Sequence, residues 1–351
     1  MMRIAIVNDM RMAVEALRRV VTSVPEYEIA WIAEDGEQAV RQCAADVPDV
    51  ILMDLIMPRM DGAEASRHIM RDSPCAILVV TATVEGNSSK VFDAMGWGAL
   101  DAVNTPVLGM SGEPSGASAL LGKIAMLGKL LGKSRPAAAV AAGTPAAIGA
   151  RQGPDFPLIA IGASTGGPTA LARVLGGLPA GLTAAVTIVQ HVDEHFAPGL
   201  ASWLAVQASR DVRVIRPNEP IAASYVQMAS TNDHLVLGPD LTFRYTKDPA
   251  DFPYRPSVDV FFRTVADYWP GTAVGVLLTG MGTDGAQGLL TMRQAGWHTI
   301  AQDEATSVVY GMPKAAAQNN AAVEILAIDD IAAGITRALT RASQVPRRRR
   351  S

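Results

Sequence analysis

Cysteine is almost absent from this 351-residue chain, in which Cys43 and Cys75 are the only two. Their spacing fits neither a CxxC pair nor a set of metal ligands, so we expect no disulfide framework and a reducing compartment. The chain also lacks any run of about 18 apolar residues, the length that predicts a membrane-spanning helix. The apolar run near the N-terminus stops at Asn8 and is too short for a signal peptide. We therefore expect a cytoplasmic protein that is not inserted in a membrane.

Neither sign of charge dominates the sequence. Lysine and arginine number 30 against 34 aspartates and glutamates, which leaves a net charge of −4. This balance offers no reason to expect a nucleic-acid partner. The exception is Arg347–Arg350, a basic tail that we interpret as solvated. With 49% apolar and 18% charged residues the chain reads as a soluble globular protein, and its length favours two domains.

Short β-rich runs alternate with helical patterns along residues 1–106. Such alternation implies right-handed βαβ crossovers and a parallel sheet. Ligands of a parallel sheet gather at the carboxyl ends of its strands, which is where Asp9, Asp54 and Thr81 fall. The predicted strands are Arg3–Val7, Ile29–Ala33, Val50–Met53, Ala76–Thr81 and Ala102–Val103, and the predicted helices are Ala13–Val21 and Glu37–Cys43.

A change of composition separates this region from the rest of the chain. Ala119–Lys133 predicts an amphipathic helix, whereas Ser134–Pro154 is poor in large apolar residues and interrupted by proline and glycine. A stretch of that kind cannot bury enough surface to order itself, so we interpret it as a flexible linker. The predicted divisions are a first domain at 1–125, a helix end and linker at 126–156, a second domain at 157–342 and a basic tail at 343–351.

A second α/β pattern follows the linker. Gly238-Pro-Asp240 stands between two apolar runs and predicts a β-hairpin within Tyr225–Tyr245. The other predicted strands are Leu158–Ile161, Ala185–Val189, Val212–Ile215 and Ala273–Leu278, and the predicted helices are Pro168–Leu175 and Ala286–Ala295.

Asp54 is the candidate phosphoacceptor of the first domain. It directly follows the apolar strand at 50–53, and Asp9 ends the neighbouring strand, so the two carboxylates could share a cation. Mg²⁺ prefers oxygen ligands, commonly one or two carboxylates with backbone and water oxygens. The alternative is that aspartates at strand ends merely cap turns and helices. Met57-Pro58, Asp61-Gly62, Thr81 and Asn104-Thr105-Pro106 complete the pattern around Asp54.

With these residues, the first domain resembles the receiver domain of bacterial response regulators, which has a flavodoxin-like fold. The resemblance implies that Asp54 accepts the phosphoryl group and that Asp9, Asp54 and the carbonyl of Ile56 bind Mg²⁺. It further implies that Thr81 is the switch hydroxyl.

Three positions depart from the receiver pattern. Asn8 stands where the family usually has an acidic residue, which removes one carboxylate from the metal site. Thr105 replaces the lysine that contacts the phosphoryl group, and Ala102 replaces an aromatic residue that often takes part in switching. The resemblance implies phosphorylation at Asp54, and leaves open what these departures do to the lifetime of the phosphoryl group and to the conformational change.

Ser164 is the candidate nucleophile of the second domain. Gly162-Ala-Ser164-Thr-Gly166 fits the G-x-S-x-G pattern between a predicted strand and a predicted helix. Small flanking residues allow the tight turn that exposes a serine oxygen, and a helix N-terminus offers N–H groups to an oxyanion. The alternative is a glycine-rich phosphate-binding turn. Neither GxGxxG nor a Walker lysine is present, which argues against nucleotide binding.

A nucleophilic serine needs a base and a residue that orients the base. His191 follows the strand at 185–189, so its position matches that of Ser164. Asp284 lies in a glycine-rich turn after another apolar strand, although it could equally be the N-cap of the helix at 286–295. His195 and His234 fall in predicted loops, where we expect solvated or structural roles.

Longer motifs make the second domain resemble the chemotaxis methylesterase family CheB. The resemblance implies Ser164 as nucleophile, His191 as base and Asp284 as orienting carboxylate, with the backbone at Thr165 and Met281 stabilising the oxyanion. It also implies a Rossmann-like, doubly wound α/β domain. The segment Val7–Met10 and the missing receiver lysine look like paralogues from Wsp-type surface-sensing systems. The motifs are Gly162–Gly167, Gln190-His191, Arg255–Phe262, Leu278–Gly285 and Ala301–Pro313.

The resemblance implies a phosphorylation-regulated protein-glutamate methylesterase that is also a protein-glutamine glutaminase. Its substrate would be a methyl-accepting chemoreceptor and its phosphodonor a CheA-type histidine kinase. Catalysis would need no cofactor. The unphosphorylated receiver would cover the catalytic cleft. Two alternatives remain open, a non-catalytic regulatory module of a chemosensory complex and a small-molecule esterase.

Overall fold

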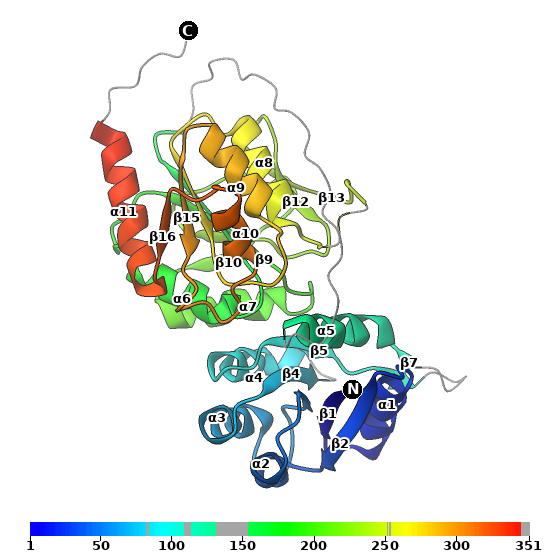
Figure 1. Ribbon diagram of the computed structural model, residues 1–351. Helices are drawn as coiled ribbons and strands as arrows, with labels where there is room; N and C mark the ends of the chain where they lie inside the picture. The colour runs from blue at the N-terminus through cyan, green and yellow to red at the C-terminus, as the bar shows by residue number, and fades with distance from the viewer. Residues whose placement is uncertain (82–83, 109–113, 131–153, 251, 253, 345–351) are drawn as a thin grey trace. The chain divides into compact units, whose positions relative to one another are not determined.

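The structure is a computed structural model that describes residues 1–351 apart from 82–83, 109–113, 131–153, 251, 253 and 345–351. The chain divides into two compact units, Met1–Ala139 and Val140–Ser351 (Figure 1). The predicted linker at 134–154, apart from Pro154, and the predicted tail at Arg347–Arg350 lie outside the described residues.

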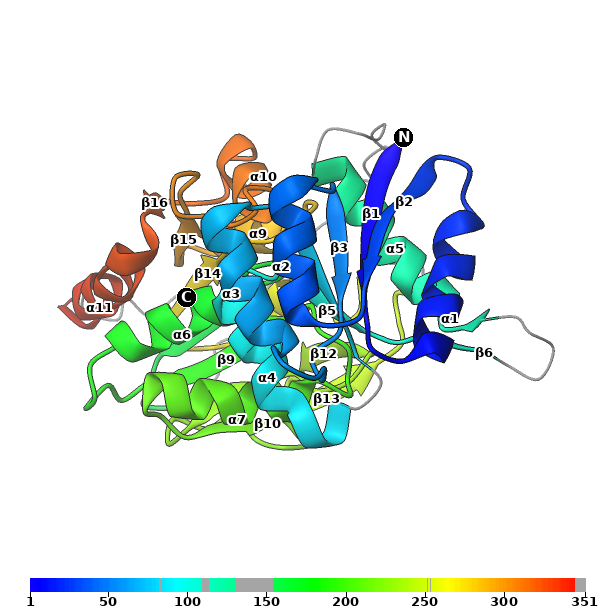
Figure 2. The same ribbon diagram turned by 90° about the horizontal axis from the view of Figure 1, so that it is seen from below.

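The N-terminal unit is built on a parallel sheet of five strands in the order β2-β1-β3-β4-β5. This strand order is that of flavodoxin-like receivers and confirms the predicted fold class. Helices α1 and α5 cover one face of the sheet, and α2, α3 and α4 cover the other (Figure 2). The elements are β1 (Met2–Val7), α1 (Arg11–Thr22), β2 (Tyr27–Ala33), α2 (Gly36–Ala45), β3 (Val50–Met53), α3 (Gly62–Asp72), β4 (Ala76–Thr81), α4 (Val84–Gly96), β5 (Asp101–Asn104), β6 (Val107–Leu108), β7 (Pro114–Ser115) and α5 (Ala117–Leu130).

Apolar runs form the neighbouring strands β3 and β4 because both faces of the sheet are buried there. All residues of β3 and β4 are buried, and both strands have the predicted bounds. Helices α3 and α4 were not predicted. The buried face of α3 consists mainly of small residues such as Ala63 and Ala65, with Ile69 as its one large apolar side chain. Periodicity of large apolar residues, the main helix signal, is therefore weak there.

The C-terminal unit is built on seven parallel strands in the order β10-β11-β9-β8-β14-β15-β16. The chain adds strands on one side of β8 and then, from β14, on the other, so the sheet is doubly wound as expected. The elements are β8 (Leu158–Ala163), α6 (Gly167–Gly177), β9 (Ala185–Gln190), α7 (Ala197–Ala208), β10 (Val212–Val214), β11 (Val226–Met228), β12 (His234–Leu237), β13 (Phe243–Thr246), α8 (Val258–Tyr268), β14 (Ala273–Leu277), α9 (Ala286–Gln294), β15 (His298–Gln302), α10 (Met312–Gln318), β16 (Glu324–Leu326) and α11 (Ile328–Gln344).

This strand order places a topological switch point between β8 and β14, which pair directly. In doubly wound sheets, ligands bind at the carboxyl ends of the strands that flank such a point. Ser164 follows β8, and Asp284 lies in the turn after β14. The topology therefore brings two residues far apart in sequence to the same edge of the sheet.

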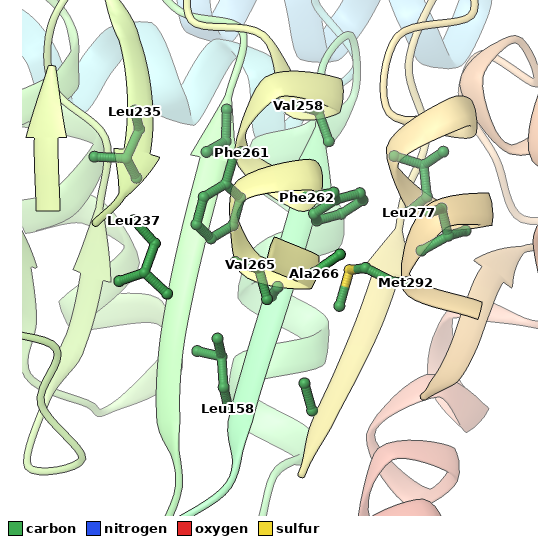
Figure 3. Packing of buried hydrophobic residues seen from close by; sticks show 14 of the residues in the cluster. Leu158, Leu235, Leu237, Val258, Phe261, Phe262, Val265, Ala266, Leu277 and Met292 are labelled. Carbon is green, nitrogen blue, oxygen red and sulfur yellow. The ribbon is translucent and has the colours of Figure 1, made fainter. Parts of the chain in front are cut away.

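One hydrophobic cluster of this unit lies between the sheet and helix α8. Phe261 and Phe262 are fully buried. Phe261 lies on the side of Leu235 and Leu237 from β12, and Phe262 lies toward β14 and α9 (Figure 3). Truncating either ring to alanine would cost about 3–5 kcal/mol of stability. This packing holds the N-terminus of α8 firmly against the sheet.

The predicted hairpin is confirmed at its turn but is shorter than Tyr225–Tyr245. Strands β12 and β13 pair antiparallel around the turn at Gly238, whose N–H donates to Thr242 O at 2.8 Å. The segment at 226–228 does not belong to the hairpin; it forms β11, parallel to β9 in the main sheet. Within the described part of the chain, no helix combines the length and apolarity needed to cross a membrane.

Candidate active site

Ser164 lies in a tight turn between β8 and α6. Its backbone N–H donates to Thr279 O at 3.0 Å, and Gly166 has a φ of 77°, a conformation that favours glycine. A side chain on Gly167 would overlap Oε1 of Gln190, so only glycine fits there. The turn therefore joins a strand to a helix in the same order as a nucleophile elbow, with the buried Ser164 directly after β8.

His191 is brought beside Ser164 by the pairing of β8 with β9. Its backbone N–H donates to Ala163 O at 3.0 Å. The buried amide of Gln190 adds a second link, since Nε2 donates to Ser164 O at 2.8 Å. Ser164 and His191 are thus connected through two adjacent central strands.

The imidazole of His191 is hydrogen-bonded to Asp284. Nε2 lies 2.8 Å from Oδ2 of Asp284. Because an ionised carboxylate can only accept, Nε2 carries the proton and Nδ1 is the basic nitrogen. Nδ1 is buried and has no hydrogen-bond partner among the described residues, and the Ser164 hydroxyl does not bond to it here. Hydrogen bonds of this kind commonly tighten only when substrate is bound.

Asp284 is held at the N-terminus of α8. Oδ1 accepts from Ser257 Oγ at 2.8 Å and from the Asp259 N–H at 3.1 Å, while Oδ2 also accepts from the Val258 N–H at 2.7 Å. Burial by itself would raise the pKa of Asp284, but the bonds from His191, Ser257 and Val258 outweigh it and hold the pKa below the usual range. The carboxylate therefore stays ionised and fixes the orientation of His191.

The alternative role predicted for Asp284, an N-cap of the helix that follows it, is wrong. The N-cap of α9 is Gly285, with a φ of 84° and no side-chain bond. Asp284 instead binds free N–H groups of α8, a helix that precedes it in sequence. Asp284 accepts hydrogen bonds from the α8 backbone and contacts His191 at the same time, so a structural role and a catalytic role are compatible.

Two backbone N–H groups near Ser164 are free to bind an oxyanion. Those of Thr165 and Met281 donate to no acceptor within the described part of the chain. A Cβ on Gly280 would lie 2.8 Å from Cβ of Ser164, so the segment that carries Met281 passes directly beside Ser164. Thr279 joins this segment to the elbow, since its hydroxyl donates to Thr165 O at 3.0 Å.

Sequence reasoning missed several residues that build the site. Ser257 lies in the motif Arg255–Phe262, but no role was predicted for it. The stacking of Tyr254 on His191 had no local signal in the sequence. His234 was placed in a loop; this is wrong, since it lies on β12 and is completely buried. Its expected structural role fits its contacts with Pro249 O and the Ser257 N–H. His195 is exposed and pairs with Asp193.

In the N-terminal unit, Asp54 lies buried at the end of β3. Oδ1 accepts from the Leu55 N–H at 2.7 Å, and Oδ2 accepts from Nδ2 of Asn8 at 3.0 Å. Burial raises the pKa of Asp54 to about 6, and the nearby negative charge of Asp9 adds to that effect. A divalent cation would relieve the repulsion between these two carboxylates, so the pair fits Mg²⁺.

The other predicted receiver residues lie around Asp54. Thr81 ends β4 and is buried, and Ile56 is 44% exposed two residues after Asp54. Thr105 Oγ1 is buried without a partner among the described residues, at the position where the receiver pattern has a lysine. No group of three or more acidic, histidine or cysteine side chains suited to a metal occurs in the described ranges. A cation here would therefore depend on two carboxylates and backbone or water oxygens.

The fold and the site define a class of protein, a serine hydrolase built on a doubly wound parallel sheet with a receiver domain on the same chain. The profile described as CheB methylesterase matches residues 159–335, and that of the response regulator receiver domain matches residues 4–108. The chain belongs to the CheB methylesterase family.

Known proteins similar to this chain agree with that membership. A Pseudomonas aeruginosa protein named protein-glutamate methylesterase/protein-glutamine glutaminase 3 is 55% identical over 94% of this chain and 98% of its own length. A Burkholderia thailandensis protein named protein-glutamate methylesterase/protein-glutamine glutaminase 4 is 55% identical over 94% of this chain and 96% of its own length. The Thermotoga maritima CheB methylesterase catalytic domain matches 52% of this chain and 98% of its own at 30% identity, with a TM-score of 0.50.

Proposed function

We propose that this protein is a phosphorylation-regulated protein-glutamate methylesterase and protein-glutamine glutaminase. Ser164 is the nucleophile, His191 the general base and Asp284 the orienting carboxylate. The observation that carries the proposal is the 2.8 Å bond between His191 Nε2 and Asp284, at the same edge of the sheet as Ser164 in its strand-turn-helix segment. Its substrate is a methyl-accepting chemoreceptor in a chemosensory two-component pathway.

In the first half of the reaction, Nδ1 of His191 takes the proton from Ser164 Oγ as that oxygen attacks the γ-carbonyl carbon of a methylated glutamate. The carbonyl oxygen becomes an oxyanion, which the free N–H groups of Thr165 and Met281 stabilise. Imidazolium formation is favoured because Asp284 is ionised beside Nε2. The proton on Nδ1 then passes to the methoxy oxygen, methanol leaves, and an acyl-enzyme remains.

In the second half, His191 Nδ1 removes a proton from water, and the resulting hydroxide attacks the acyl carbon. The same N–H groups stabilise the second oxyanion, and Ser164 leaves with the proton from His191. The products are a glutamate side chain and free enzyme. A glutamine side chain presents the same carbonyl geometry, so attack on it releases ammonia in place of methanol.

Phosphorylation of Asp54 by a CheA-type histidine kinase regulates this activity. Asp9, Asp54 and the Ile56 carbonyl would hold Mg²⁺, which would neutralise the oxygens of the incoming phosphoryl group. Thr81 is the switch hydroxyl, at the end of the strand next to β3. A phosphoryl group adds about −1.5 to −2 charge, enough to rearrange nearby polar contacts. We place the protein in the cytoplasm, with the receiver at 1–125, a helix end and linker at 126–156 and the catalytic domain at 157–342.

The test is methanol release from methylated receptor membranes, with and without a small phosphodonor. Wild type should release methanol faster with the phosphodonor, Ser164→Ala should release none above background, and Asp54→Asn should keep only the basal rate. Methanol release that survives Ser164→Ala would overturn the mechanism. Full complementation of a deletion strain by Ser164→Ala would favour a non-catalytic regulatory module, and activation that survives Asp54→Asn would overturn the assigned switch.

A further inference from the structure

The imidazole of His191 is held by hydrogen bonding at only one of its two nitrogens. Nε2 bonds to Asp284, whereas Nδ1 has no partner among the described residues. A single hydrogen bond defines a direction but leaves the ring able to rotate about it. General-base catalysis requires Nδ1 to remain within about 3 Å of the Ser164 hydroxyl in the reacting complex. A second constraint on the ring plane is therefore needed.

Tyr254 supplies a contact of that kind. Its ring is parallel to the imidazole of His191, with an interplanar angle of 1° and centroids 4.8 Å apart. The tyrosine hydroxyl rests against Gly282, where an added Cβ would overlap it, and Gly282 has a φ of 80°. Tyr254 therefore touches both the base and the segment that carries the proposed oxyanion donor Met281.

The segment that carries Tyr254 is itself anchored on both sides of the ring. His234 is buried on β12 and bridges this segment, because Nδ1 accepts from the Ser257 N–H at 3.1 Å and Nε2 lies 3.1 Å from Pro249 O. Ser257 continues the connection through its 2.8 Å bond to Asp284. His234 thus bonds to the chain on both sides of Tyr254, at Pro249 and at Ser257, and Ser257 also supports the orienting carboxylate.

We propose that Tyr254 is the positioning residue for His191, with its aromatic face holding the imidazole in the plane that directs Nε2 to Asp284 and Nδ1 to Ser164. The stack has a second effect during the reaction. The imidazolium that forms when Ser164 loses its proton lies over an electron-rich ring face, which attracts a cation within about 6 Å. Tyr254 acts through His191 and transfers no proton itself.

This proposal rests on the proposed function, and its test compares Tyr254→Phe, which keeps the aromatic face, with Tyr254→Leu, which removes it. Tyr254→Phe should retain kcat for methanol release within about threefold, whereas Tyr254→Leu should lower kcat about 10–100-fold with little change in KM. Tyr225→Leu is the matched control, since Tyr225 is also half-buried and stacked, against Arg213, but touches no residue of the site. It should keep the wild-type kcat.

A second measurement tests the role of Tyr254 without depending on which substrate the enzyme uses. Alkyl fluorophosphonates form an Oγ–P bond with an activated serine and release fluoride, with His191 accepting the proton. Labelling of Ser164 by such a probe should slow in Tyr254→Leu by the same factor as kcat and stay fast in Tyr254→Phe. If wild type labels in this way but releases no methanol from receptor, the substrate assignment fails while the role of Tyr254 is still tested.

Three outcomes would overturn the role of Tyr254. Wild-type kcat in Tyr254→Leu would show that the stack is not needed. Equal losses in the leucine and phenylalanine variants would assign the effect to the hydroxyl, and a rise in KM alone would make Tyr254 a substrate contact. Tyr254→Met, which fills a similar volume without an aromatic face, replaces the leucine variant if that one does not fold. The upfield ring-current shift of the His191 ring protons should persist only in Tyr254→Phe.

Discussion

Asn8 donates a hydrogen bond of 3.0 Å from Nδ2 to Oδ2 of Asp54, the proposed phosphoacceptor. The Asn8 side chain is held in this orientation because its Oδ1 accepts a hydrogen bond from the Met10 N–H at 2.8 Å. The Nδ2 end of the side-chain amide therefore faces Asp54. Where an acidic residue would repel the acceptor carboxylate, Asn8 stabilises it with a neutral donor, and cation binding at this site is left with one carboxylate fewer.

The first prediction concerns the cation affinity of the receiver. Asn8→Asp should lower the Kd for Mg²⁺ by about tenfold, because a third carboxylate, beside those of Asp9 and Asp54, adds a hard oxygen ligand and attraction for the cation. Isothermal titration calorimetry with MgCl₂ measures this directly. Asn8→Ala, which removes the donor without adding charge, is the control and should not tighten binding. Equal Mg²⁺ affinity in wild type and Asn8→Asp would contradict the metal site proposed here.

The second prediction concerns the orienting carboxylate. Asp284→Asn should lower kcat for methanol release by about 10³–10⁴-fold, because an amide nitrogen facing Nε2 favours the tautomer with a proton on Nδ1. That tautomer cannot accept the proton of Ser164. Steady-state kinetics should show KM nearly unchanged, and a loss smaller than tenfold would argue against His191 as the base. Circular dichroism before the assay checks that the variant is folded.

The third prediction concerns stability against pH. Burial, with a further contribution from the charge of Asp284, raises the pKa of Asp259 to about 6. A raised carboxyl pKa means that the folded state binds the proton more tightly than the unfolded state. The associated stability is fully present below pH about 4 and is lost as the pH rises through about 6. A shift of about two units corresponds to roughly 3 kcal/mol as an upper figure.

Asp259→Asn tests that pH dependence without losing the local hydrogen bond. Oδ1 of Asp259 accepts from the Gly288 N–H at 2.6 Å, and an amide oxygen can accept in the same way. Urea unfolding should show the variant about 1–2 kcal/mol more stable than wild type at pH 7, and the two curves should converge near pH 4. A constant difference between pH 4 and pH 7 would mean that Asp259 does not titrate in that window.

The fourth prediction concerns the buried histidine that anchors the segment carrying Tyr254. His234→Ala leaves the Ser257 N–H and Pro249 O without their partner and creates a cavity. Urea unfolding should show a loss of about 3 kcal/mol, and kcat should fall with little change in KM. His234→Asn, whose amide oxygen can accept from Ser257, should lose less. His195→Ala is the control, since that side chain is 60% exposed, and it should change stability by less than about 0.5 kcal/mol.

Much of the fold was predictable because its signals are local. Strands such as Ala76–Thr81 are unbroken apolar runs, and their bounds agree with the structure. Helix α3 was missed because small residues fill most of its buried face, and β11 was assigned to the hairpin because a short apolar run does not reveal its partner. Strand pairing depends on the whole sheet, so hydrophobic patterning identifies a strand more readily than its neighbours.

The sequence by itself determined the chemical groups of the site and their approximate position. Ser164, His191 and Asp284 each follow an apolar strand, and parallel strands bring such ends to one edge. Only the tertiary structure decided which nitrogen of His191 faces Asp284, a residue 93 positions away. It also decided that α8 holds the carboxylate and that Tyr254 stacks on the imidazole. The physical reason is that these contacts depend on strand order and on which helix end packs at the switch point, and neither is encoded in a local pattern.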